Sequence, residues 1–173
     1  SFSVNKIFGM WLLWLACLLY LGTLIGGRQM IPLPIFGVGY FIGFILILSN
    51  KKIVSNYPSK FQKRITLLSI VLMIFLLFLL GGPHFSDENY RLVWLNAFLA
   101  VGIHFIPFAF IYGVLMIPLA TLVIINALVG IFYSDISFVY FSNINSVLLA
   151  VFGIIFLLVK SSKQKRSDDN GNN

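Results

Sequence analysis

The chain has 173 residues, of which 60% are hydrophobic and only 10% are charged. A soluble domain has about 45–50% apolar and 25% charged residues, so this composition excludes a water-soluble globule. Two histidines, one cysteine and five acidic residues also leave little material for a metal site or a catalytic triad. We therefore expect a membrane protein without catalytic residues, metal ions or cofactors.

The apolar residues form blocks that are long enough to cross a membrane. A hydrocarbon layer about 30 Å thick requires about 20 helical residues. Six blocks of roughly this length cover residues 7–26, 33–49, 65–80, 92–112, 114–133 and 145–159. We expect residues 136–141, which precede the last block, to lie at the membrane interface.

The blocks are apolar on every side and do not alternate, which predicts helices rather than the strands of a membrane barrel. The predicted fold is therefore an all-α polytopic membrane protein with six transmembrane helices. These helices form one domain over residues 1–160, and a disordered polar tail follows over residues 161–173.

The positions of lysine and arginine predict the orientation of the helices, because these residues stay in cytoplasmic loops. If both termini are cytoplasmic, ten of the twelve basic residues face the cytoplasm: Lys6, Lys51, Lys52, Lys60, Lys63, Arg64, Lys160, Lys163, Lys165 and Arg166. Only Arg28 and Arg91 face outward. Contact with anionic lipid headgroups explains the net charge of +7, and we expect no nucleic-acid partner.

Two outer loops carry polar residues that form a candidate site. Arg28 follows the first span, and His84, Asp87, Glu88 and Arg91 follow the third. The near balance of charge favours pairing within this group, with Arg28 held by Glu88 or Asp87. The alternative is a vestibule that binds an anion, because guanidinium groups bind carboxylates and phosphates well.

The fourth span carries a histidine deep in the hydrocarbon layer. His104 lies about twelve residues, or ~18 Å, from the outer end of this helix. A polar ring at this depth normally faces other helices or a wet cavity. Pro107 lacks the amide that would bond to the carbonyl of Ile103, which leaves a free acceptor beside the ring. His104 is therefore either a proton relay or ligand contact, or a structural residue that donates to a nearby carbonyl.

Asn126 in the fifth span is the expected partner of His104. On adjacent antiparallel helices the two residues differ in height by about 6 Å, so direct contact or one bridging water is expected. Asn96 adds a polar group near the outer end of the fourth span. The alternative role of Asn126 is a hydrogen bond that joins two helices.

Residues 102–108 read Gly-Ile-His-Phe-Ile-Pro-Phe. This segment resembles a G-x-H-F-x-P-F motif of small, uncharacterised multi-pass membrane proteins of bacteria. The resemblance implies a bacterial plasma membrane, and it implies no particular activity.

The leading hypothesis from the sequence is a non-enzymatic protein that binds or transports a small solute through a polar vestibule on its outer face. The predicted ligand-binding residues are His104, Asn126, Asn96, Arg28, His84, Glu88 and Arg91. The alternative is an accessory or immunity-type protein that contacts another membrane protein, a second copy of itself, or lipid. A third hypothesis, an intramembrane enzyme, has acids and bases in the two histidines and Glu88 but lacks an evident nucleophile.

Overall fold

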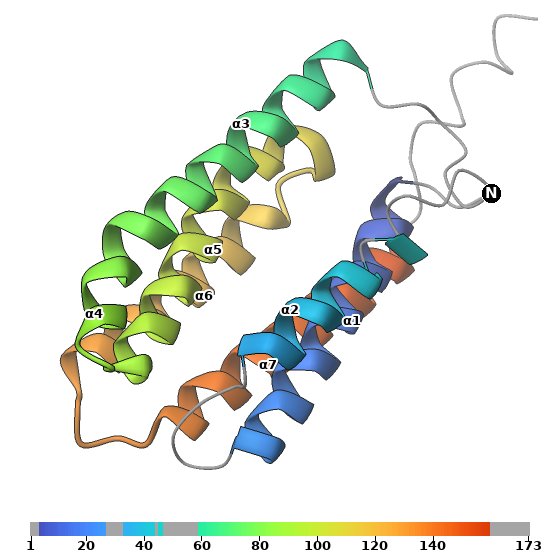
Figure 1. Cartoon of the computed structure of the whole chain (residues 1–173). Coiled ribbons are helices and arrows are strands. Elements are labelled where there is room, and N and C mark those ends of the chain that lie inside the picture. Colours follow the sequence, from blue (N-terminus) through green and yellow to red (C-terminus); the bar gives the residue numbers. More distant parts are fainter. Residues whose placement is uncertain (1–3, 27–32, 44, 47–58, 160–173) are drawn as a thin grey trace, which may run out of the picture.

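The computed structural model describes residues 4–26, 33–43, 45–46 and 59–159 (Figure 1). Its elements are α1 (Val4–Gly26), α2 (Leu33–Gly43), α3 (Lys60–Leu76), a π-helical turn η2 (Leu77–Gly81), α4 (Gly82–Ser86), α5 (Tyr90–Tyr112), α6 (Met116–Phe132) and α7 (Phe138–Leu158). No strand occurs in this part of the chain, so the predicted all-α class is confirmed.

Four helical segments are long and apolar enough to cross a membrane: Asn5–Gly26, Lys60–Ser86, Tyr90–Tyr112 and Phe138–Leu158. The helix α6 is apolar but shorter, and α2 is described over 11 residues. Residues 47–49 of the expected second span lie outside the described chain, as do Arg28 and the predicted tail.

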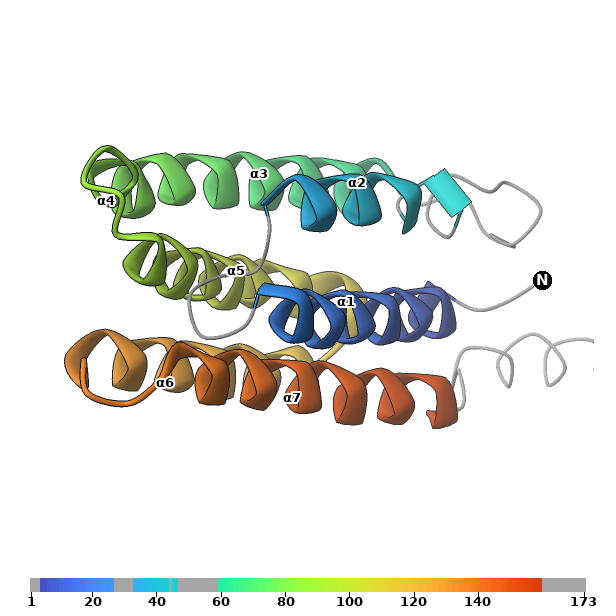
Figure 2. The same cartoon turned by 60° about the horizontal axis from the view of Figure 1, so that its bottom comes forward.

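The helices form an open ring. In order around this ring, α2 packs on α1, α1 on α7, α7 on α6, α6 on α5, and α5 on α3. Figure 1 shows the result as two groups, with α1, α2 and α7 in one and α3, α5 and α6 in the other; Figure 2 shows the same helices from a second direction. The described residues of α2 and α3, at the two ends of this order, share no extensive contact.

The first and last helices run antiparallel and pack through small residues. Three facing pairs make this contact: Gly9 with Gly153, Ala16 with Ser146, and Thr23 with Ser142. The hydroxyl of Ser146 donates to the Ala16 carbonyl at 2.7 Å, and the Thr23 and Ser142 hydroxyls lie 2.6 Å apart. Small side chains let two helix backbones approach closely in a membrane. The spacing of seven residues in α1 keeps its small residues on one face.

The last helix begins earlier than the sequence predicts. We expected it to start near Asn145, but α7 starts at Phe138 and includes the polar segment that follows. Three polar side chains of this segment bond to other helices: Ser142 to Thr23 and Ser146 to the Ala16 carbonyl of α1, and Asn145 to Asn126 of α6. Residues 138–141 of the segment that we expected at the membrane interface form the first turn of α7.

The third span is longer at both ends than predicted. It starts at Lys60, where Ser59 and Gln62 form a capping box that satisfies the first backbone amides. It then continues through Gly81 and Gly82 to Ser86, by way of the π-helical turn. The outer loop predicted over residues 81–91 is reduced to residues 87–89, because α5 begins at Tyr90.

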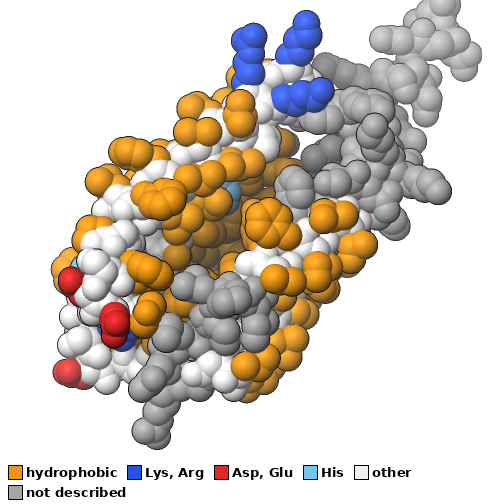
Figure 3. Space-filling model, in the orientation of Figure 1, with side chains coloured by type: hydrophobic (Ala, Val, Ile, Leu, Met, Phe, Trp, Pro, Cys, Tyr) orange, Lys and Arg blue, Asp and Glu red, His pale blue; other side chains and the backbone are white. Residues whose placement is uncertain are grey.

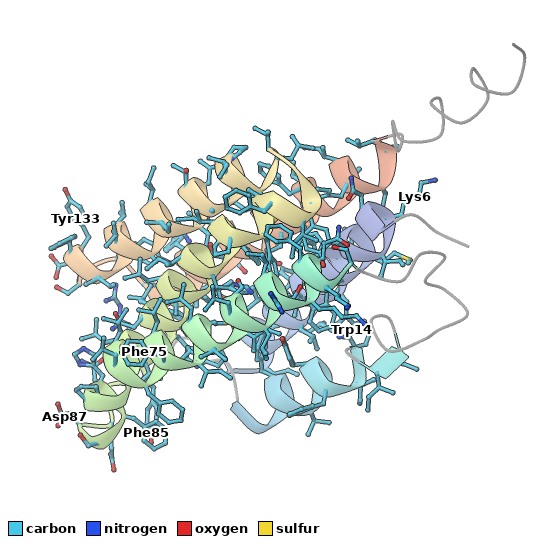
Figure 4. The ribbon with its side chains drawn as sticks, turned by 90° about the horizontal axis from the view of Figure 1, so that it is seen from above. Lys6, Trp14, Phe75, Phe85, Asp87 and Tyr133 are labelled. Carbon is cyan, nitrogen blue, oxygen red and sulfur yellow. The ribbon has the colours of Figure 1, made fainter. Side chains whose placement is uncertain are left out.

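The charged side chains separate between the two ends of the bundle. One end, which we call the basic end, holds Lys6, Lys60, Lys63 and Arg64, and the other, the acidic end, holds Asp87, Glu88 and Asp135 (Figure 3). Figure 4 shows Lys6 at the opposite end from Asp87 and Tyr133. Arg91 is the one described basic residue at the acidic end.

Candidate ligand-binding cavity

A cavity of about 520 Å³ occupies the gap in the helix ring. Phe36 and Gly37 of α2 form one side, Phe78 of η2 and Gly82 of α4 form the other, and α5 contributes the back wall as far as Val101. The space-filling view shows this hollow between α3 and α2, with hydrophobic side chains around it (Figure 3). Ligand pockets commonly measure about 300–1,000 Å³, so the volume suits a small molecule.

The cavity lies in the half of the bundle next to the acidic end. The segment from α3 to α4 contributes residues only from Met73 onward, and α5 contributes residues only from Val93 to Val101. Both stretches are the parts of their helices closest to Asp87. The basic end of the bundle is therefore remote from the cavity.

The lining of the cavity is almost entirely apolar. Leucine, isoleucine, valine, methionine, alanine, glycine and phenylalanine supply all of it except Tyr40, Trp94 and Asn145. No charged residue of the described chain lines it. Because a polar group without partners loses free energy on leaving water, this surface favours an apolar ligand over a hydrated solute.

Two buried hydrogen-bond donors in this wall lack a partner. Asn145 accepts a hydrogen bond at Oδ1 from Asn126 at 3.0 Å, but its own Nδ2 donates to no other described residue. The Nε1 of Trp94 also meets no acceptor, but this atom is fully buried and does not reach the cavity surface. A buried donor left unpaired costs about 1–3 kcal/mol, which makes the Nδ2 of Asn145 the candidate for contact with a ligand.

The glycines of α2 have two different roles. A Cβ at Gly39 or Gly43 would collide with Leu18 or Trp14 of α1, and Trp14 Nε1 donates to the Gly39 carbonyl at 2.9 Å. These two glycines hold α2 against α1. A Cβ at Gly37 would meet nothing within 4 Å, so this glycine leaves space beside the cavity instead.

His104 is buried, but it does not line the cavity. Its Nδ1 lies 2.9 Å from the carbonyl oxygen of Val101 in the same helix, and its ring packs against Phe105 and Phe108. The hydroxyl of Ser69 in α3 donates to the His104 carbonyl at 2.7 Å. These contacts favour the structural interpretation of His104, and α5 continues without a break past Pro107.

Asn126 bonds to α7 and not to His104. Its Nδ2 donates to the Phe141 carbonyl at 2.9 Å and to Asn145 Oδ1 at 3.0 Å. The expected contact with His104 is not found in the described structure. Asn126 thus joins α6 to α7, and it supports Asn145 from behind the cavity wall.

The remaining predicted site residues do not gather into one site. His84 lies half-buried on α4, and Glu88 is exposed with a backbone φ of 54°. Asn96 is buried and donates to the Leu92 carbonyl of its own helix at 2.9 Å. Arg28 lies outside the described residues.

Arg91 binds backbone carbonyls rather than the carboxylates that we expected as its partners. Its Nη2 donates to the carbonyl oxygens of Tyr133 and Ile136 at 3.0 Å each. Its guanidinium carbon lies 5.8 Å from the centre of the Phe141 ring. Arg91 therefore fastens the loop between α6 and α7 to the start of α5.

Replacing Arg91 with alanine should lower the free energy of unfolding by about 1–3 kcal/mol, because two charge-assisted hydrogen bonds and a cation–π contact are lost. Thermal unfolding of the protein in detergent measures the change. Arg64→Ala is the matched control, since Arg64 is exposed near the start of α3. We expect a change within about 0.5 kcal/mol there. Equal midpoints for the two variants would contradict this role of Arg91.

The sequence analysis missed Trp94, Asn145 and Gly37. A usable signal was present for Asn145, because Ser142, Asn145 and Ser146 follow the spacing of one helical face. Trp94 and Gly37 carry no such signal, since their importance depends on which helices leave a gap between them.

An all-helical chain with four helices long and apolar enough to cross a membrane has the features of a polytopic membrane protein. More particularly, the chain belongs to a family of unknown function (DUF6609), whose model matches residues 1–166. No curated protein matches the chain, and no solved structure does. Within the described residues, no three histidine, cysteine or acidic side chains lie close enough together to hold a metal ion.

Proposed function

We propose that this protein is a non-enzymatic integral membrane protein that binds a small apolar molecule in the cavity between α2 and α3. It crosses the membrane six times and keeps both termini in the cytoplasm. The resemblance at residues 102–108 makes the bacterial plasma membrane part of this proposal.

The arrangement of the shorter helices supports six spans. Both α2 and α6 run alongside the longer helices, between the same two ends of the bundle (Figures 1 and 2). The 17 residues of α6 extend about 25 Å, which nearly matches the hydrocarbon layer. Cytoplasmic placement of the basic end follows from the preference of lysine and arginine for that side. Lys60, Lys63 and Arg64 would then face anionic headgroups.

The observation that carries the proposed binding function is an apolar cavity whose mouth lies between two membrane helices. A molecule dissolved in the hydrocarbon layer reaches such a cavity without passing through water. The polar vestibule expected from the sequence would need charged or polar walls, whereas the lining here contains no described charge. The lining therefore favours a lipid-like ligand over the polar solute that we expected from the sequence.

Photolabelling of the protein in a lipid bilayer tests whether an apolar molecule binds in the cavity. The protein is reconstituted into lipid nanodiscs with a long-chain alkyl diazirine, and the photolabelled peptides are identified by mass spectrometry. We expect labels on α2, η2 and the first half of α5, where the cavity-lining residues lie. Gly37→Phe should remove most of this labelling, because the new ring occupies open space next to the cavity. The change also removes a helix glycine, which favours folding.

Val38→Phe is the matched control for this experiment. It places the same ring one residue further along α2, at a position that is 61% exposed and does not line the cavity. We expect its labelling to equal that of the unmodified protein. Equal loss in both variants, or labels spread evenly over all exposed faces, would refute binding in the cavity.

The second candidate function is contact with another membrane protein, and the side of α3 that faces away from the other helices favours it. Leu67, Leu68, Val71 and Phe75 are 64%, 62%, 54% and 59% exposed. A photoreactive amino acid at position 68 tests whether a protein partner or lipid covers this side of α3 in native membranes. A single discrete protein adduct would support a partner, while lipid adducts alone would indicate ordinary contact with the bilayer.

A further inference from the structure

The polar atoms in the cavity wall point to the chemistry of the ligand. Asn145 is 2% exposed and lines a surface that is otherwise almost entirely apolar. Its Oδ1 already accepts a hydrogen bond from Asn126, while its Nδ2, which can only donate, has no described acceptor. The Nε1 of Trp94 also has no acceptor, but it is fully buried and cannot be reached from the cavity. The hydroxyl of Tyr40, the third polar group of the lining, can donate as well as accept.

We infer that the ligand is a long apolar molecule with an uncharged carbonyl oxygen, which accepts a hydrogen bond from the Nδ2 of Asn145. This inference rests on the proposed function, because it specifies the ligand of the same cavity. An ester of a glycerolipid and a ketone or quinone with a long tail share this chemistry.

The absence of charge in the described lining limits the ligand further. No described lysine, arginine, histidine or carboxylate lines the cavity, so an ionised headgroup inside it would have no counter-charge. A buried charge without a partner is strongly unfavourable. The part of the ligand that enters is therefore neutral, and any charged group stays outside the mouth.

The amide of Asn145 is held in place by other helices. Its Oδ1 accepts a hydrogen bond from Asn126, which itself donates to the Phe141 carbonyl. These bonds fix the donor before a ligand arrives, so a hydrogen bond formed by the ligand loses little entropy.

A competition experiment tests the inference on the full chain in nanodiscs. A long-chain methyl ketone and the alkane of equal length each compete with the alkyl diazirine for labelling of the cavity. We expect the ketone to compete about three- to tenfold better with the unmodified protein, as one hydrogen bond in a buried site allows. Asn145→Leu removes the donor and should reduce the ketone preference to about one.

Trp94→Phe is the control that separates this effect from a general change in the cavity wall. It removes the N–H group of a lining residue, but this group does not reach the cavity, so we expect the ketone preference to be retained. Should Asn145→Leu fail to fold, Asn126→Leu tests the inference instead. It removes the bond that orients the Asn145 amide, so the ketone preference should fall while labelling of the cavity persists.

The outcomes distinguish this inference from the proposed function. No cavity labelling in the unmodified protein would overturn the proposed function itself. Cavity labelling with equal competition by ketone and alkane would overturn only the inferred carbonyl of the ligand, as would a preference that survives in Asn145→Leu. Lipids that copurify with the unmodified protein but not with Gly37→Phe identify the source by mass spectrometry. A glycerolipid or a quinone supports the inference, and a hydrocarbon without a carbonyl contradicts it.

Discussion

Replacement of Gly153 with leucine should prevent α1 from packing on α7 and should leave little folded protein. A Cβ at Gly153 would lie 2.9 Å from Leu13 Cγ and 3.0 Å from the Gly9 carbonyl oxygen, and leucine adds three more carbon atoms beyond it. The carbonyl belongs to a helix backbone, which cannot move aside as a side chain can. Overpacking of this kind costs about 1–3 kcal/mol where side chains can adjust, and we expect a larger loss here.

Unfolding in detergent and the yield of monodisperse protein on size-exclusion chromatography measure this effect. Gly37→Leu is the matched control, because a Cβ at Gly37 in the helix α2 meets nothing within 4 Å. Leucine is favoured over glycine within a helix, so this variant should fold normally. Similar unfolding midpoints for the two variants would show that α1 and α7 are not in close contact.

The effect of Gly153→Leu should extend beyond one pair of helices. The α1–α7 contact connects the start and end of the described chain, and α2 is held in the bundle mainly by packing on α1. Loss of this contact would therefore displace the α2 side of the cavity. Diazirine labelling should fall together with stability in this variant, whereas Gly37→Phe should lower labelling alone.

The helical fold follows from features that the sequence displays locally. Apolar blocks of membrane-spanning length predict helices because only helices satisfy every backbone group within a short apolar segment. Helix ends are harder to predict where distant residues decide them. The polar segment from Ser142 to Ser146 looks like a break in the sequence, but Thr23, Ala16 and Asn126 supply its hydrogen bonds. Those partners are far away along the chain.

The candidate site was less predictable, for a related reason. We predicted His104 and Asn126 as ligand-binding residues because polar residues are rare in membrane helices. The side chain of His104 instead lies against a carbonyl of its own helix, and that of Asn126 bonds to α7. The cavity arises instead where the described residues of α2 and α3 share no extensive contact. The order of helices around the ring determines that gap, and small-residue contacts such as Gly9 with Gly153 determine the order. Pairwise packing of this kind is not visible in the hydropathy of single segments.

Cysteine labelling should place the two ends of the bundle on opposite sides of the membrane. In a Cys17→Ser background, Ser134→Cys at the acidic end should react with a membrane-impermeant maleimide on intact cells. Lys60→Cys at the basic end should react only after the cells are permeabilised. Both positions are exposed, so accessibility within the fold does not limit either reaction. The expected contrast is close to all-or-none, because an intact bilayer separates the reagent from one site.

The same labelling decides which leaflet supplies the ligand. The cavity lies beside the acidic end, so an outward-facing Ser134→Cys assigns its mouth to the outer leaflet. Labelling of Lys60→Cys on intact cells would reverse the topology and move the mouth to the inner leaflet. The apolar lining and the unpaired amide nitrogen of Asn145 would be unchanged by that reversal, since they depend on the fold and not on its direction. A test of ligand chemistry therefore remains valid under either orientation, while the lipid available to the cavity differs between them.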